Sequence, residues 1–510
     1  MGSSAEIIKK TFFQIRSTCN EILDIFRFSR NEILISCVLL VLNVFARGVA
    51  FFNLKYSVDD YHHSLNLLSG SYDFVIAQGR FFAVVLYKML GLIGVGSQES
   101  ALMNSFFSLL AYIAVSIFIL RAWRVSDRFS AIVIGSLVTL HPYVGEVFSF
   151  NILTMTISYA LVLCFSGLLL LRSERVLTKT IGVIFISLSL AIYQVVFGYV
   201  SIVVIVLIMQ RIYEHTTVKQ MCFEILKVVK AIVFPLFVSL LIYFVLNFIV
   251  QKFYAGILVS RSGFINISEI FQRFVLVKRL FVLMYFQNEP FFPWTTKLFI
   301  LCIYGLSLVS IFMMNRKKIP LAILKTTLFL IFLFILLLMP AGLIIPLTDW
   351  WPVPRVLSGA GIVLASGIVL VHQGKIKKVC NVLVVLIIVS FIGVANSICY
   401  DQALMNIRDR SHIEGIISAI DENRNIKKIA LIGVRWNYAL QVKTAYMDMN
   451  ISAFGPAWSK YNSIMHYAGK RIEVASDAEI KDIEAYLKSN KIELRDFSRI
   501  VINDTLVVGL

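Results

Sequence analysis

The sequence predicts an all-α polytopic membrane protein with about eleven transmembrane helices, followed by a small α/β domain at the C-terminus. Hydrophobic residues make up 58% of the 510 residues, and the mean hydropathy is +0.82. Soluble domains are close to half apolar, so this excess indicates a membrane protein. The apolar residues also form runs of the length that crosses a bilayer, about 20 residues, and the charged residues lie in short clusters between those runs.

The apolar runs define the expected spans. They cover residues 32–52, 99–121, 129–147, 152–171, 231–251, 297–314, 321–345, 357–372 and 379–398. The stretch 180–211 is long enough for two short spans, with a break near Gln194–Gly198. We therefore expect a cytoplasmic segment at 1–30, a membrane domain at 31–399 and a separate domain at 400–510.

The basic clusters set the expected orientation. Lys and Arg are enriched in cytoplasmic loops, which accounts for the net charge of +18 without nucleic acid. If residues 80–96 cross the membrane, Arg121, Arg124 and Arg128 fall outside. If they lie on the surface as an amphipathic helix, every basic cluster falls inside. We adopt the second arrangement, which leaves loops 53–98, 252–294 and 346–356 and the tail outside.

The tail, 400–510, changes character from the rest of the chain. The segments "IKKIALIGV" and "RIVINDTLVVGL" predict strands, and "DAEIKDIEAYLKSN" predicts a charged helix with an Asp cap. The seven cysteines are scattered, mostly within apolar runs, and none lies beyond Cys399. They are typical of reduced packing residues rather than disulfides or metal ligands.

Two adjacent acids, Asp59 and Asp60, follow the first span. Neighbouring residues on a helix point about 100° apart, so one carboxylate could act as a general base while the other holds the loop or the sugar. The alternative is a turn at the membrane edge whose acids cap the next helix. His62 and His63 could join them around a metal, but no third spaced ligand appears, so we predict no metal site and leave a divalent metal open.

Further polar residues could bind a donor phosphate or sugar at the outer side. Arginines suit phosphate because the guanidinium binds it through two hydrogen bonds, tryptophans stack on sugars, and polar groups near membrane depth line cavities. The alternatives are arginines that extend to the membrane interface, plain interfacial helices and interfacial aromatic residues. The candidates are Tyr56, His62, Arg80, Glu146, Arg261, Arg279, Trp350 and Arg355.

The order of these motifs resembles a known family. An acid pair after the first span, then a Gly-Arg surface helix and a long span ending in arginines, is similar to the GT-C membrane glycosyltransferases. The finer pattern resembles the type II Gtr family of serotype-converting O-antigen glucosyltransferases. It rests on "YSVDDYHHSL", "GRFFAVVLYKMLGLIG", "HPYVGEVFSFNILTMTISYAL", "SLAIYQVVFGYVSI" and "WPVPRVLSG". The resemblance covers Lys55 to about Gly359 and does not extend to 400–510.

The resemblance implies a reaction. The donor would be a polyprenyl-phosphate sugar, undecaprenyl-phosphate glucose, and the acceptor an O-antigen glycan on the periplasmic face of the bacterial inner membrane. No cofactor is expected. The catalytic base of the superfamily maps onto Asp59, with Asp60 in a supporting place. The His-His pair departs from the family pattern, so Arg80 and Arg355 are the expected phosphate ligands.

Several alternatives remain at this stage. A direct displacement would invert the anomeric centre, whereas a retaining reaction needs a second carboxylate, for which Glu146 and Asp349 are candidates. A transferase for another sugar or acceptor would share the pattern. A flippase or other transporter would place ionisable groups near the middle of its spans. An O-antigen polymerase or ligase would place its key arginines in a later loop and lack the early acids.

Overall fold

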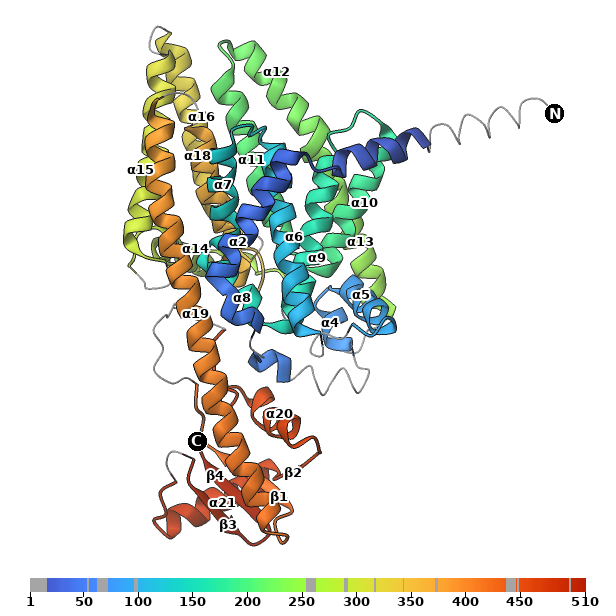
Figure 1. The fold of residues 1–510 in the computed structure, drawn as a ribbon, viewed down its shortest axis with the longest axis vertical. Helices are drawn as coiled ribbons and strands as arrows, with labels where there is room; N and C mark the ends of the chain where they lie inside the picture. The colour runs from blue at the N-terminus through green and yellow to red at the C-terminus, as the bar shows by residue number, and fades with distance from the viewer. Residues whose placement is uncertain are drawn as a thin grey trace, which may run out of the picture.

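The structure is a computed structural model. It describes residues 16–52, 55–61, 72–95, 100–253, 263–288, 292–315, 318–342, 344–371, 375–436, 446, 449–494 and 497–510. Most of these residues form one bundle of apolar helices, and a small domain with a β-sheet lies beyond one end of it (Figure 1). We call that end of the bundle the domain side.

The bundle contains long helices and several short ones. The long ones are α2 (Arg30–Phe52), α6 (Ala101–Ala122), α9 (Asn151–Leu170), α10 (Val176–Ile192), α11 (Val196–Glu214), α13 (Phe234–Phe253), α15 (Trp294–Asn315), α16 (Ile319–Leu338) and α19 (Lys375–Glu422). The shorter ones are α4 (Asp73–Ala77), α5 (Phe81–Leu92), α7 (Arg128–Leu140), α8 (Pro142–Ser149), α12 (Val218–Val228), α14 (Ile270–Tyr285), α17 (Pro354–Leu357) and α18 (Ala360–Leu370).

The structure confirms a mostly helical protein with many spans. Within the described ranges, seven helices are long and apolar enough to cross a membrane, or eight if the bent pair α7 and α8 counts as one span. Three shorter apolar helices, Thr154–Leu170, Val176–Ile192 and Pro354–Leu370, lie where further spans were expected. The described residues thus show seven or eight candidate spans together with these shorter apolar helices, and α9 as a whole has the roughly 20 residues that a bilayer requires.

The centre of the bundle is tightly packed. Helices α9 and α10 approach closely because Gly167 and Gly182 face each other: a Cβ on Gly167 would lie 2.7 Å from the Gly182 carbonyl oxygen. Small residues at such crossings let helix backbones meet in a membrane protein. The expected break in 180–211 falls at Tyr193–Val195, between α10 and α11.

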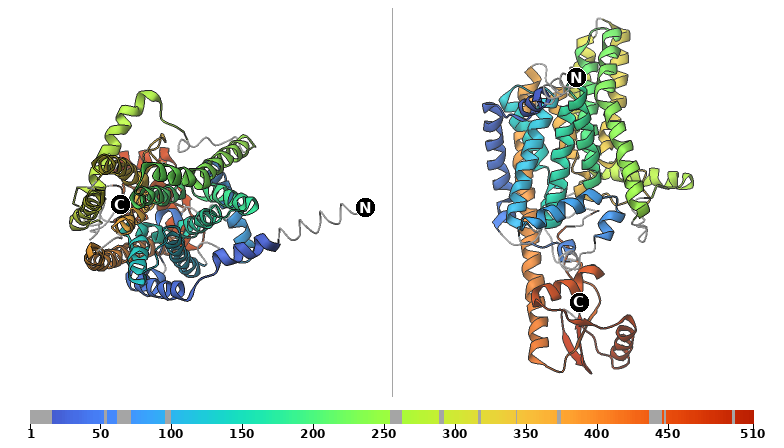
Figure 2. Two further views of the ribbon diagram at one scale, coloured as in Figure 1. Left: turned by 90° about the horizontal axis from the view of Figure 1, so that it is seen from above. Right: turned by 90° about the vertical axis from the view of Figure 1, so that its right-hand side faces the viewer.

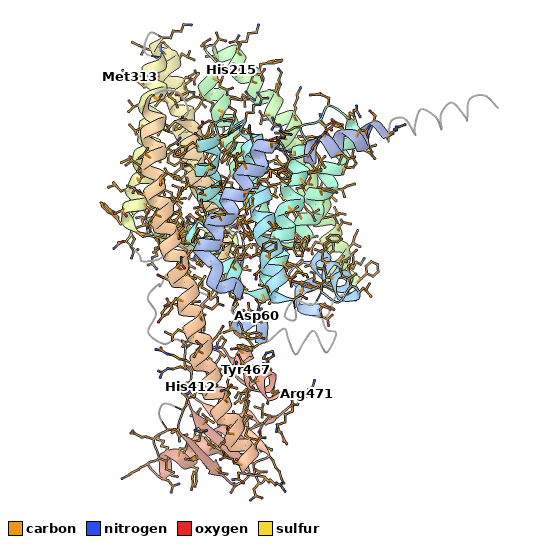
Figure 3. All side chains as sticks on the ribbon, viewed as in Figure 1. Asp60, His215, Met313, His412, Tyr467 and Arg471 are labelled. Carbon is orange, nitrogen blue, oxygen red and sulfur yellow. The ribbon has the colours of Figure 1, made fainter. Side chains whose placement is uncertain are left out.

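Ion pairs mark the end of the bundle that lies away from the sheet. At the end away from the sheet, Arg121 pairs with Glu32 at 2.6 Å and Arg175 with Glu21 at 3.5 Å. The N-terminal helix that carries Glu21 lies across this end (Figure 2). Figure 3 places His215 and Met313 at this end as well, whereas Asp60 lies on the domain side.

The C-terminal domain contains a four-stranded mixed sheet in the order β2-β1-β4-β3. Strand β1 (Lys428–Ile432) runs parallel to β2 (Glu473–Val474) and β4 (Thr505–Gly509), whereas β3 (Arg499–Ile502) pairs antiparallel with β4. The end of α19 and α20 (Ala457–Ala468) cover one face, and α21 (Asp477–Ser489) covers the other. The strands match the expected segments, and the cap of α21 is Ser476 rather than an aspartate, because its hydroxyl accepts the backbone N–H of Glu479.

Helix α19 joins the bundle to this domain. It contains 48 residues and continues without a break through residue 400, where the separate domain was expected to begin. Figure 1 shows it passing along the bundle and into the C-terminal domain as a single helix.

Candidate active site

The acid pair lies in one helical turn, residues 58–61, just beyond α2. We call residues 55–61 the acid turn. Asp60 is completely buried, and its Oδ2 accepts hydrogen bonds from Ser57 N at 2.8 Å, Ser57 Oγ at 2.9 Å and Asn151 N at 3.2 Å. Its own N–H donates to Ser57 Oγ at 3.3 Å, which completes a capping box. Asp60 therefore fastens the acid turn to the first residue of α9.

Asp59, one residue earlier, is half-buried. Because successive residues of a helical turn point about 100° apart, its carboxylate cannot occupy the position that Asp60 takes against α9. The two neighbouring acids thus have different surroundings: one is enclosed by backbone and hydroxyl donors, and the other keeps access to solvent.

The junction between α8 and α9, residues 146–151, is joined to the acid turn by hydrogen bonds. Lys55 Nζ donates to the Phe148 carbonyl oxygen, and Asn151 Nδ2 donates to the Lys55 carbonyl oxygen at 2.6 Å. Burial lowers the pKa of the Lys55 ammonium to about 8; the nearby Asp60 carboxylate acts in the opposite direction and the Arg47 guanidinium in the same direction. Residues almost a hundred positions apart in the chain are thus fixed at one point.

Glu146 and Arg355 form a buried ion pair at the same junction. The Arg355 backbone N–H donates to Glu146 Oε2 at 2.5 Å, and its Nη1 donates to Oε1 at 3.1 Å. Glu146 has no exposed surface, and Arg355 is 8% exposed with its guanidinium 4.8 Å from the ring centre of Phe150. Both residues were expected to contact substrate. The structure gives each of them an internal partner of opposite charge, so a phosphate at Arg355 would have to compete with Glu146.

Arg80 begins α5, and its guanidinium lies 4.7 Å from the ring centre of Tyr193. The turn before it needs the left-handed backbone of Gly79, with φ +76°. Gln194 Nε2 holds this turn by donating to the Gln78 carbonyl oxygen at 2.9 Å. The break between α10 and α11 thus positions Arg80 on the domain side of the bundle.

The remaining candidates are more scattered. Trp350 is half-buried and lies 4.9 Å from the guanidinium of Arg273, which also donates to the carbonyl oxygens of Leu347 and Thr348 at 2.6 and 2.9 Å. Arg279, on the same helix α14, is exposed. The structure thus joins Trp350 to Arg273, not to the predicted Arg279. His62 and Arg261 lie outside the described residues.

The C-terminal domain packs against the acid turn. Tyr56 N–H donates to Asn406 Oδ1 at 3.0 Å, and Asn406 Nδ2 donates back to the Tyr56 carbonyl oxygen at 2.9 Å. The Tyr56 ring stacks on Tyr61 at 5.4 Å and meets His466 of α20 edge-on at 4.9 Å. In Figure 3, Tyr467 of α20 lies next to Asp60 on the domain side. Helices α19 and α20 therefore help to shape the acid turn.

A comparison with known families bears on this arrangement. The model of the family described as Glucosyl transferase GtrII matches residues 48–372, well over half of the chain. The chain belongs to this family. The match confirms the family expected from the sequence motifs. No curated protein and no solved structure matches the chain.

The GtrII match includes the acid turn, the α8–α9 junction and the Glu146–Arg355 pair, and it ends before α19 begins. Among the described residues, no group of three His, Cys, Asp or Glu side chains is arranged to hold a metal ion. Arg47, near the end of the first span, was not among the candidates, although a lone charge at such a position is a sequence signal for function. Its guanidinium lies against the α8–α9 junction, 5.2 Å from the ring centre of Phe148.

Proposed function

We propose that this GtrII family member transfers a glucosyl group from a polyprenyl-phosphate donor, undecaprenyl-phosphate glucose, to an O-antigen glycan. Membership of the family makes it a membrane glucosyltransferase and implies O-antigen glucosylation. The donor, the periplasmic face of the bacterial inner membrane as the place of reaction, and a change of serotype as its result are our proposals. A lipid-linked donor fits a site at the end of a bundle of apolar helices, because the polyprenyl chain can stay in the bilayer.

In this proposal Asp59 is the general base. A hydroxyl oxygen of the acceptor attacks the anomeric carbon of glucose, and the new C–O bond forms as the bond from that carbon to the phosphate oxygen breaks. Asp59 accepts the hydroxyl proton, and the electron pair of the broken bond leaves with the polyprenyl phosphate. The observation that carries this assignment is the difference in burial between the two acids, since only a carboxylate within reach of substrate can act as a base.

The Glu146–Arg355 pair favours direct displacement. A retaining reaction would need a second carboxylate as nucleophile, and the buried Glu146 carboxylate already accepts two hydrogen bonds from Arg355. With Glu146 engaged, only Asp349 is left of the two candidates for a second carboxylate, and we propose inversion at the anomeric carbon. Arg80 would face the developing charge on the phosphate, where preorganised donors lower the barrier most.

The test is transfer of labelled glucose from undecaprenyl-phosphate glucose to O-antigen by the purified full-length protein. Asp59→Asn should lower the transfer rate about 100-fold or more, the usual contribution of a general base. The matched control is Asp73→Asn, because Asp73 is an exposed acid on the nearby α4 and should be dispensable. Transfer by Asp59→Asn at the wild-type rate would disprove the role of Asp59. Transfer of a different sugar in place of glucose would disprove the donor.

A further inference from the structure

Arg47 occupies an unusual position for a charged residue. It lies in the last turns of α2, is 1% exposed and sits 17 residues after Arg30, about 26 Å along the helix at 1.5 Å per residue. That length is close to the thickness of the hydrocarbon core, about 30 Å. Arg47 is therefore at the level where lipid phosphate groups meet the apolar core, on the domain side of the bundle.

The guanidinium of Arg47 is held firmly but is only partly paired. Its Nη1 donates to Asn43 Oδ1 at 2.5 Å, and Asn43 is itself fixed by donating to the Thr139 hydroxyl at 2.9 Å. Arg47 Nε and Nη2 are buried and have no hydrogen-bond partner in the described part of the chain. A buried charge without a counter-charge is among the costliest arrangements in a protein. Such a group is expected to have an anionic partner in the working protein.

Two further hydrogen-bond donors, the Tyr112 hydroxyl and the Lys55 ammonium, lie near Arg47. The Tyr112 hydroxyl is also buried and unpartnered within the described ranges, and its ring lies 5.7 Å from Phe148. The Lys55 ammonium reaches the carbonyl of the same Phe148 from the acid turn. Three donor groups from α2, α6 and the acid turn thus surround Phe148, two of them beside its ring and the third at its carbonyl oxygen. A ligand with several negatively charged oxygens would satisfy them together.

The buried carboxylates of this region are already used. Asp60 binds Ser57 and Asn151, and Glu146 binds Arg355. Among the described residues, Arg355 therefore has a carboxylate partner and Arg47 has none. The planar guanidinium of arginine matches the geometry of a phosphate group.

We propose that Arg47, assisted by Tyr112 and Lys55, binds the phosphate of the polyprenyl-phosphate substrate. The ligand class is a lipid phosphate. Its isoprenoid chain would remain in the bilayer, and its phosphate group would lie beside Phe148, next to the acid turn. This site would secure the leaving group, whereas Asp59 handles the acceptor. The inference rests on the proposed function for its substrate class, but it is tested by binding rather than by transfer.

The experiment measures binding of polyprenyl phosphate and of the uncharged polyprenol to the full-length protein in phosphatidylcholine nanodiscs. Wild type should bind the phosphate at least tenfold more tightly than the alcohol. Arg47→Gln should remove most of this preference, leaving only what Arg80 supplies, and Arg47→Lys should restore part of it. The matched control is Lys297→Gln. Lys297 is another fully buried cation, but its ammonium donates to the carbonyl oxygens of Leu283 and Gln287, so its loss should leave the preference intact.

Two competitors identify the source of the phosphate. Inorganic phosphate and phosphatidylglycerol should displace polyprenyl phosphate only at much higher concentration. Equal competition by either would overturn the proposal, because the site would then take any phosphate or any anionic lipid. An unchanged preference in Arg47→Gln would overturn it as well.

A second, milder variant tests the proposal if Arg47→Gln fails to fold. If Arg47→Gln does not fold, Tyr112→Phe removes only one hydroxyl and should lower the preference about threefold; no change would overturn the proposal. A wild-type protein that binds polyprenyl phosphate through Arg47 but transfers no glucose would disprove the proposed function and leave this site standing.

Discussion

Separate replacement of the two acids should have different effects: loss of the Asp60 charge should lower stability, and loss of the Asp59 charge should lower activity. Asp60→Asn keeps an acceptor oxygen for Ser57 and Asn151 but removes the charge from three hydrogen bonds. Hydrogen bonds to a charged group contribute about 1.5–3 kcal/mol each and neutral ones about half as much. The substitution should therefore lower the free energy of unfolding by about 2–3 kcal/mol after allowing for the relief of burying a charge.

The corresponding change in Tm is modest for a chain of this size. With an unfolding entropy of about 2.1 cal/mol/K per residue, 510 residues give about 1 kcal/mol per degree, so Tm should fall by roughly 2–3 °C. Asp60→Ala should cost more, because it leaves buried donors without an acceptor. Asp59→Asn should change the stability by less than about 1 kcal/mol, since Asp59 is half-buried.

The assay pairs thermal unfolding in detergent with labelled-glucose transfer, performed on the same preparations. We expect Asp60→Asn to lower Tm and to retain part of its activity below that temperature, and Asp59→Asn to keep its Tm and lose transfer. The reasoning is refuted if Asp59→Asn is as destabilised as Asp60→Asn, or if Asp60→Asn unfolds at the wild-type temperature.

Three further outcomes follow from contacts described above. Glu146→Gln should destabilise the protein by about 3–5 kcal/mol, because it leaves the Arg355 charge buried and unpaired, and thermal unfolding should show partial recovery when Arg355→Met is added. Asn406→Ala should cost about 1–2 kcal/mol locally and speed hydrogen exchange in the acid turn, with slower transfer; unchanged exchange would contradict the contact. A hydrogen bond from Lys428 lowers the pKa of Glu479 from 4.5 to about 2, so its stabilisation of α21 is complete above pH 4.5 and disappears as the pH falls towards 2. Hydrogen exchange of α21 should show this loss in wild type, and Glu479→Gln should remove the pH dependence.

The predictions that rested on local sequence patterns were the reliable ones. Apolar runs located the spans, and the break near Gln194 appeared where polar groups interrupt one of them. The apolar run 379–398 did not reveal that α19 continues to Glu422, because hydropathy reports the solvent around a helix and not where the helix ends. Residues 399–422 contain no proline and a single glycine, Gly415. Because few helix-breaking residues interrupt this stretch, the helix continues into a polar environment.

The site depended on contacts that no local pattern contains. Asp60 meets Asn151 across 91 positions, and Glu146 meets Arg355 across 209. Sequence chemistry identified three of these four residues as polar groups of interest but could not show which would satisfy one another. A lone arginine near the end of an apolar run was visible in the sequence, but only the three-dimensional arrangement shows that its Nε and Nη2 have no partner among the described residues.

The continuous helix α19 fixes the distance between the bundle and the C-terminal sheet. Its 48 residues span about 72 Å at 1.5 Å per residue, so the height of the C-terminal sheet above the bundle is set by a count of residues rather than by a flexible tether. Inserting one residue between the bundle and Asn406 would lift the sheet by about 1.5 Å and turn it by about 100°, which would separate it from the acid turn. A loop of equal length would absorb such a change, whereas this connection transmits it directly to the acids.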